Sequence, residues 1–94
     1  MSLITNPAHP GEVLKGLYLD PIEFSAGKLA RHLGVPRTRI ERLIKGQTGI
    51  TTDTAARLAK FFGTSRQLWM NMQTNYDLAN DDTDVSGIET LETA

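Results

Sequence analysis

Residues 28–46 read KLARHLGVPRTRIERLIKG, and this stretch predicts two short helices joined by a sharp turn. The first helix has an apolar stripe at helical spacing, made of Leu29, Ala30 and Leu33. Gly34 can end that helix in the left-handed conformation, and Pro36 suits the start of the next one. The stretch therefore has the outline of a helix-turn-helix.

The second helix of this stretch carries cations on the side opposite its apolar residues. Its apolar stripe consists of Ile40, Leu43 and Ile44. At about 100° per residue, the side chains that point away from this stripe are Thr38, Arg42 and Lys45. Arg37 and Arg39 flank them. A short helix with cations and a hydroxyl outside matches a recognition helix that enters the major groove of DNA. The alternative is an ordinary helical hairpin with a solvated basic face.

Length and composition limit the chain to one small domain. It has 94 residues, 39% of them hydrophobic, and no cysteine. No apolar run approaches the roughly 18 residues that a membrane span needs, and the N-terminus lacks the pattern of a signal peptide. We therefore expect a compact cytoplasmic protein without disulfides and without a membrane partner.

Charge is distributed unevenly along the chain. The formal net charge is −1, but all ten Lys and Arg residues lie at or before Arg66. Residues 1–70 have a balance of +5, whereas residues 71–94 contain six acids and no cation. Because phosphate binding depends on the local field, the negative total does not exclude a nucleic-acid partner.

The segment before the motif predicts one more helix. His9-Pro10 resembles a helix start, and Asp20-Pro21 should end the helix. Its expected apolar face consists of Val13, Leu14, Leu17 and Tyr18. Ser25 is a suitable N-cap for the first helix of the motif.

Catalytic and metal sites find little support. His9 and Glu12 could supply two metal ligands, but the other imidazole, His32, is expected on a different helix. Neither a nucleophile with a base partner nor a glycine-rich phosphate loop is evident. We therefore expect no enzyme activity, no metal and no cofactor.

A polar loop follows Gly46, and two further helices follow the loop. Gln47 and Thr48 in that loop could reach a DNA phosphate, or the loop could simply be solvated. Thr51 is a suitable cap for a helix over residues 52–62. A last helix should run from Thr64 or Ser65 to about Asn80.

The last helix has a long apolar stripe. Its members are Leu68, Trp69, Met72, Tyr76 and Ala79. The stripe could complete the core alone, or its Leu68, Met72 and Tyr76 could also form a homodimer interface; the N-terminal arm is the alternative region for a dimer contact. Residues 81–94 are expected to be an acidic, flexible tail.

Four segments together resemble the HigA-type antitoxins, within the Xre-like group that shares a phage-repressor helix-turn-helix. They are HPGEVL, LARHLGVPRTRIERLIKG, ITTDTAARLAKFFGTS and LWMNMQTNYDL, within residues 8–79. The resemblance implies an all-α, five-helix domain, here residues 8–80 with the motif at 25–46. It also implies a homodimer that represses its own operon at a palindromic operator and neutralises a small mRNA-cleaving toxin.

The resemblance also assigns roles to residues by position. It implies base reading by Arg37, Thr38 and Arg42. It implies flanking or phosphate contacts by Ser25, Arg39, Lys45, Gln47 and Thr48. Pro36 departs from the Ser or Thr more usual there, which removes one possible phosphate contact.

Two rival readings remain open from sequence. The first is a stand-alone repressor of the same fold without a toxin, since a fold does not fix a function. The second is a protein-binding inhibitor whose helix-turn-helix has lost DNA binding, although the exposed cations of the second helix argue against it.

Overall fold

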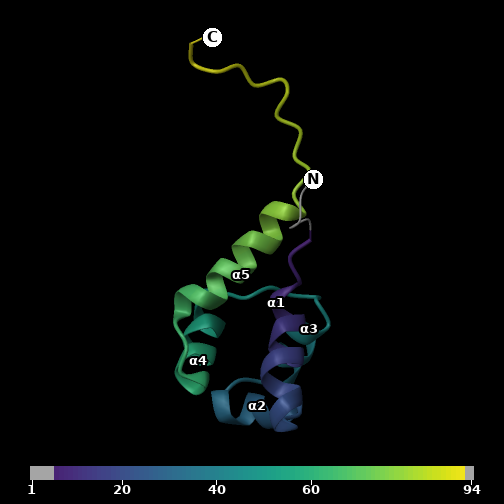
Figure 1. The fold of residues 1–94 in the computed structure, drawn as a ribbon, viewed down its shortest axis with the longest axis vertical. Coiled ribbons are helices and arrows are strands. Elements are labelled where there is room, and N and C mark those ends of the chain that lie inside the picture. The colour runs from purple at the N-terminus through teal and green to yellow at the C-terminus, as the bar shows by residue number, and fades with distance from the viewer. Residues whose placement is uncertain (1–5, 93–94) are drawn as a thin grey trace.

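The computed structural model describes residues 6–92, and within them the chain is helical without strands. Five α-helices follow one another (Figure 1). The first is extended by a π-helical segment and then by a 3-10 turn. Their bounds are α1 Pro10–Val13, η1 Leu14–Leu19, η2 Asp20–Ile22, α2 Ala26–Leu33, α3 Arg37–Ile44, α4 Thr52–Phe62 and α5 Arg66–Ala79. The predicted all-α, five-helix fold is confirmed.

The core lies where all five helices meet. Its fully buried side chains include Leu14, Leu29, Ile40, Leu58 and Trp69, one each from η1, α2, α3, α4 and α5. The Trp69 indole is 0% exposed, and its Nε1 donates to the Thr64 hydroxyl at 2.8 Å. Burial of such large apolar side chains stabilises the fold by about 1.5–3 kcal/mol each. The core therefore fixes the inner faces of α2 and α3.

The predicted apolar face of the first helix is partly wrong. Leu17 is 72% exposed, whereas Leu19 is buried. The cause is the π-helical turn η1. Because its hydrogen bonds join residue i to i+5, Leu19 and not Leu17 lies on the same face as Leu14.

The predicted end of that helix at Asp20-Pro21 is also wrong by one turn. The chain continues as the 3-10 turn η2 and leaves the helix at Glu23, which has a φ of 56°. Proline is tolerated in a first helical turn, since its missing N–H has no partner there. Asp20 therefore keeps a helical conformation.

Helix α5 extends beyond the body, and the chain after it continues away from the body as an extended tail (Figure 1). The principal extents of 55 × 29 × 23 Å reflect this tail. Hydrogen bonds within it are local, such as the one from the Ile88 amide to the Val85 carbonyl. Within residues 6–92, no helix has both the length and the apolar character needed to cross a bilayer.

Candidate nucleic-acid interface

Local hydrogen bonds and one glycine determine the geometry of α2 and of the turn that leads to α3. The Ser25 hydroxyl caps α2 by accepting from the Lys28 amide at 3.0 Å. Gly34 ends α2 with a φ of 72°, which is a conformation that glycine adopts readily. The Val35 amide then donates to the Ala30 carbonyl at 3.1 Å. These contacts fix the angle at which α3 leaves α2.

Helix α3 presents its predicted polar face to solvent. Ile40 and Leu43 are buried against the core. Thr38, Arg42 and Lys45 are exposed. Among residues 6–92, neither Arg42 nor Lys45 has an ion-pair partner, so their donors are available to an anionic ligand.

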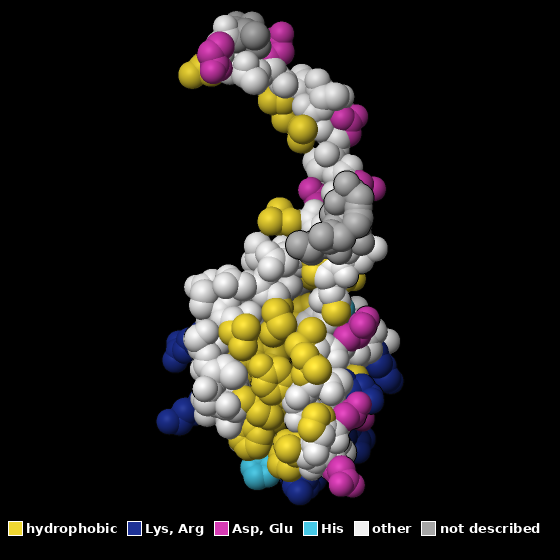
Figure 2. Space-filling view, in the orientation of Figure 1, with side chains coloured by type: hydrophobic (Ala, Val, Ile, Leu, Met, Phe, Trp, Pro, Cys, Tyr) yellow, Lys and Arg dark blue, Asp and Glu magenta, His cyan; other side chains and the backbone are white. Residues whose placement is uncertain are grey.

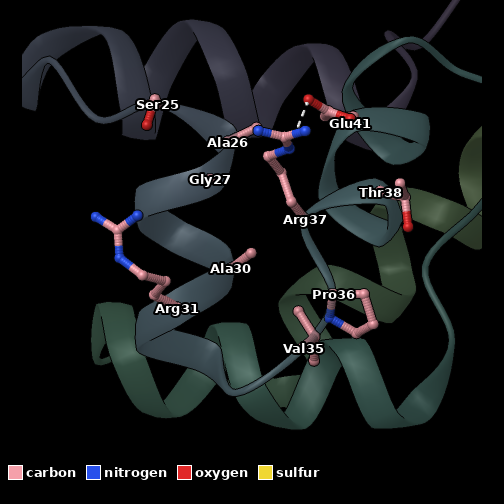
Figure 3. Close-up of a pocket in the computed structure, with 10 residues that line it drawn as sticks. All are labelled: Ser25, Ala26, Gly27, Ala30, Arg31, Val35, Pro36, Arg37, Thr38 and Glu41. Carbon is pink, nitrogen blue, oxygen red and sulfur yellow. Dashed lines mark ion pairs between the residues drawn. The ribbon is translucent and has the colours of Figure 1, made fainter.

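Arg37 is exposed but partly engaged. Its Nε lies 3.3 Å from a carboxylate oxygen of Glu41, one turn further along α3 (Figure 3). The pair borders a hollow between α2 and α3 whose lining includes Ser25, Gly27 and Arg31. Arg37 must release Glu41, or share it, before its guanidinium can reach a base.

Arg39 is held by α4. Its guanidinium contacts the carboxylate of Asp53, which also accepts from Arg57 Nε at 3.0 Å. Hydrogen bonds from Arg39 and then from Arg57 hold the pKa of Asp53 below its ordinary value. Arg57 in addition donates to the Leu33 carbonyl at 2.8 Å, so the network ties α3, α4 and the end of α2 together. The predicted flanking role of Arg39 remains a prediction.

The loop after α3 is positioned by α5. The Ile50 amide donates to the Gln73 side-chain oxygen at 2.6 Å. Gln47 and Thr48 are exposed in this loop, beside a second hollow whose lining includes Thr38, Arg42 and Thr48. The two hollows share Thr38; the first is also lined by Ser25 and Arg37, and the second also by Arg39. Lys45 and Gln47 are exposed but line neither hollow.

Sequence reasoning missed four residues that shape this candidate interface. Arg31, Arg57 and Asp53 enter the sequence analysis only through the charge balance of residues 1–70. Gln73 was not singled out. The spacing of Asp53 and Arg57, four residues apart on a helix, was a signal for their pair. Nothing local indicated that Gln73 would reach a loop 23 residues earlier.

The three predicted dimer residues lie on α5 with different surroundings. Leu68 is 37% exposed, and Met72 packs partly against the core. Tyr76 packs edge-on against the His9 ring, with 4.8 Å between centroids. The dimer role of this helix stays a prediction. The other candidate, the arm before Ala8, lies mostly outside the described residues.

His9 has a structural role in α1. Its Nδ1 caps the helix by accepting from the Gly11 amide at 2.9 Å, and the residue is 7% exposed. His32 stacks on the Phe24 ring and packs against the Phe61 ring at a tilt. In the part of the chain that the structure describes, no three acidic or imidazole side chains gather into a group that could hold a metal ion.

Comparisons of the sequence place the motif in a known group. Residues 21–69 match the helix-turn-helix family. The chain is 46% identical to virulence-associated protein I of Dichelobacter nodosus, over 88% of this chain and 77% of the relative. It is 35% identical to antitoxin HigA-1 of Vibrio cholerae, over 77% of this chain and 68% of the relative.

Solved structures with a similar fold include members of the HigA family. The antitoxin HigA of Pseudomonas aeruginosa, solved with the higBA promoter, is 42% identical, with a TM-score of 0.77 over 79% of this chain and 80% of that one. A HigA-family antidote protein of Coxiella burnetii is 44% identical, with a TM-score of 0.75 over 79% and 80%. A hypothetical protein of Escherichia coli is 33% identical, with a TM-score of 0.88 over 94% and 96%.

Proposed function

Because this chain belongs to the HigA-type antitoxins of the helix-turn-helix family, we propose that it binds an operator upstream of its own gene and represses its own operon. Residues 8–80 are the DNA-binding domain in this proposal, and residues 81–94 are an acidic tail. The single observation that carries it is the outer face of α3, where Thr38, Arg42 and Lys45 are exposed together.

The chemistry of that face suits DNA. Arginine can pair with the O6 and N7 of guanine, and lysine with a phosphate. The tight turn from α2 holds the N-terminal end of α3 outward, which is how recognition helices meet base edges. A similar chain, the P. aeruginosa antitoxin, was solved with a promoter. Arg37, Thr38 and Arg42 are therefore proposed to read bases. Ser25, Arg39, Lys45, Gln47 and Thr48 are proposed to contact phosphates or flanking groups.

A homodimer follows from the size of the motif. One recognition helix covers only a few base pairs, and two copies spaced about 34–36 Å apart read a palindrome with useful affinity. Because α3 faces DNA, the contact between copies lies elsewhere, and α5 with Leu68 and Met72 offers the apolar surface. Met72→Asp should give a folded monomer with much weaker operator binding. A Met72→Asp variant that sediments as a dimer at micromolar concentration would move the interface to the N-terminal arm.

The partner of an antitoxin is a toxin, and we propose a small mRNA-cleaving protein encoded beside this gene. Co-purification of the two products, together with a mobility-shift assay on the upstream DNA, tests both halves of the proposal. Loss of the shift would overturn the DNA-binding half, and failure of the neighbouring product to co-purify would favour a stand-alone repressor. In either case the chain acts in the cytoplasm and by binding, without catalysis or cofactor.

A further inference from the structure

The large apolar side chains that this chain leaves exposed fall into two groups. One group belongs to the body and comprises Leu17, Ile22 and Leu68. The other group belongs to the end of α5 and the tail and comprises Leu78, Val85, Ile88 and Leu91. Apolar surface gathered in this way marks an interaction site when it forms a continuous patch.

Two members of the body group, Leu17 and Leu68, are neighbours in sequence of a cluster of aromatic rings. We define an apolar face as Leu17, Tyr18, Phe61, Phe62 and Leu68. The Tyr18 and Phe62 rings lie 4.9 Å apart between centroids, as do those of Phe62 and Phe61. Figure 2 shows hydrophobic side chains running down the front of the body without a charged side chain among them. None of the five residues belongs to α3, so the face can be covered while DNA is bound.

The tail cannot cover this face of its own body along the path it takes. It leaves α5 in the direction away from the body (Figure 1). Ile88 is 75% exposed and Leu91 is 92% exposed. From Asp81 to Glu92 the tail holds five acids and no cation, and its twelve residues can span at most about 40 Å.

The match to one solved chain extends past the end of α5. The E. coli protein matches 94% of this chain, whereas residues 1–80 are only 85% of it. Part of the tail must therefore be included in the match.

Charge and symmetry indicate that the partner of the tail is a second copy of this chain. Lys60 and Arg66 line one hollow at the junction of α4 and α5, directly before Phe61 and close to Leu68 in sequence. Within residues 6–92 neither cation has an ion-pair partner, so both can receive tail carboxylates. If α5 packs antiparallel on its own copy, the body of the second copy lies beyond the end of α5, where the tail runs.

We propose that each tail crosses to the second copy and packs Val85, Ile88 and Leu91 against that copy's apolar face. The proposal rests on the homodimer of the proposed function and assigns it a second contact. It also keeps the tail acids beside cations of the second copy and away from the DNA phosphates.

Disulfide trapping tests the proposal, since the chain has no cysteine of its own. Full-length Ile88→Cys and Leu17→Cys chains are mixed and oxidised. We expect a covalent pair of chains to form several-fold faster than with Thr52→Cys in place of Leu17→Cys, because Thr52 is exposed on another part of α4. A rate equal to that of the Thr52→Cys control would overturn the proposal. So would closure within a single chain of a Leu17→Cys/Ile88→Cys double variant.

A second measurement separates the tail from the dimer itself. Replacing Val85, Ile88 and Leu91 by serine in the full chain should raise the dimer dissociation constant about tenfold or more, a change of about 1.4 kcal/mol. Ser86→Ala with Gly87→Ala alters the same segment and should leave the constant unchanged. If Met72→Asp abolishes the dimer while the serine variant keeps it intact, the tail contact is refuted and the proposed homodimer stands. A monomeric wild-type chain would refute both.

Discussion

The side-chain oxygen of Gln73 in α5 accepts a hydrogen bond from the backbone amide of Ile50, with 2.6 Å between the two atoms. Ile50 is 4% exposed and closes the loop that follows α3. The Gln73 amide nitrogen in turn donates to Asp77 at 2.8 Å. The helix proposed for the dimer thus directly holds the loop proposed for phosphate contact.

Gln73→Ala should therefore weaken both stability and DNA binding. An amide left without its partner costs about 1–3 kcal/mol, which urea denaturation can measure. Gln67→Ala is the matched control, because Gln67 makes an exposed hydrogen bond to Asn71 one turn away on the same helix. Gln73→Glu retains the acceptor oxygen but sets a second carboxylate against Asp77, so it should recover most of the loss only when combined with Asp77→Asn. Equal effects of Gln73→Ala and Gln67→Ala would contradict the structural role of this bond.

Arg42→Ala should reduce operator binding much more than binding to random DNA. A bidentate pair with guanine discriminates against other bases by about 1–3 kcal/mol. Arg37→Ala should have the same kind of effect, reduced by the cost of releasing Glu41. Lys45→Ala should weaken binding to operator and random DNA equally. It should also lower the slope of log affinity against log salt concentration by about one. Titrations of each variant with operator and random DNA at several salt concentrations measure these affinities. If Arg42→Ala loses the same affinity for both DNAs, Arg42 is a phosphate contact.

Asp53→Asn should remove a stabilisation that depends on pH. Since Arg39 and Arg57 lower the pKa of Asp53 from its ordinary value of 3.8, the folded state favours the carboxylate. The stabilisation by the Asp53 carboxylate is complete at pH values above its ordinary pKa. It is lost as the pH falls through the lowered pKa of the folded state. Urea midpoints of wild type and variant should differ by a constant amount at about pH 5–7, and the difference should shrink only as the pH falls below the ordinary pKa of 3.8. A difference that persists at the lowest pH would argue against a charge effect.

Gly11→Ala should destabilise the fold strongly. A Cβ at Gly11 would lie 1.8 Å from the Leu43 carbonyl oxygen, so α1 would have to move away from α3. Overpacking of this kind typically costs about 1–3 kcal/mol. At Gly16 a Cβ would meet nothing within 4 Å, and Gly16→Ala should be neutral or slightly stabilising. Thermal unfolding of the pair measures the contrast, and similar melting temperatures would show that α1 adapts without cost.

The elements that sequence predicted well depend on neighbouring residues. Ser25 and Thr51 each cap the helix that follows them, as expected, and of the two candidates Thr64 and Ser65 it is Ser65 that caps α5. Gly34 ends α2 as expected. A cap requires only the amides two or three residues ahead, so its signal is complete within one turn of sequence.

The elements that sequence did not predict depend on distant residues or on helix type. The π-helical turn moves Leu17 to the surface and Leu19 into the core, and a pattern of 3.6 residues per turn does not contain that shift. His9 meets Tyr76, and Ile50 meets Gln73, across long stretches of chain. Six of the eight predicted DNA-facing residues line the two hollows along α3. The engagement of Arg37 by Glu41 and of Arg39 by Asp53 became visible only in the three-dimensional structure.

The separation of charge between body and tail gives the molecule a strong electric dipole moment along its longest direction. The ten cations all belong to the body, and the six acids after Met70 belong to the end of α5 and the tail. In the field of a polyanion such a molecule experiences a torque that turns its basic end forward before any contact is made. Fewer collisions then arrive in an unproductive orientation, and this advantage declines as salt shortens the range of the field.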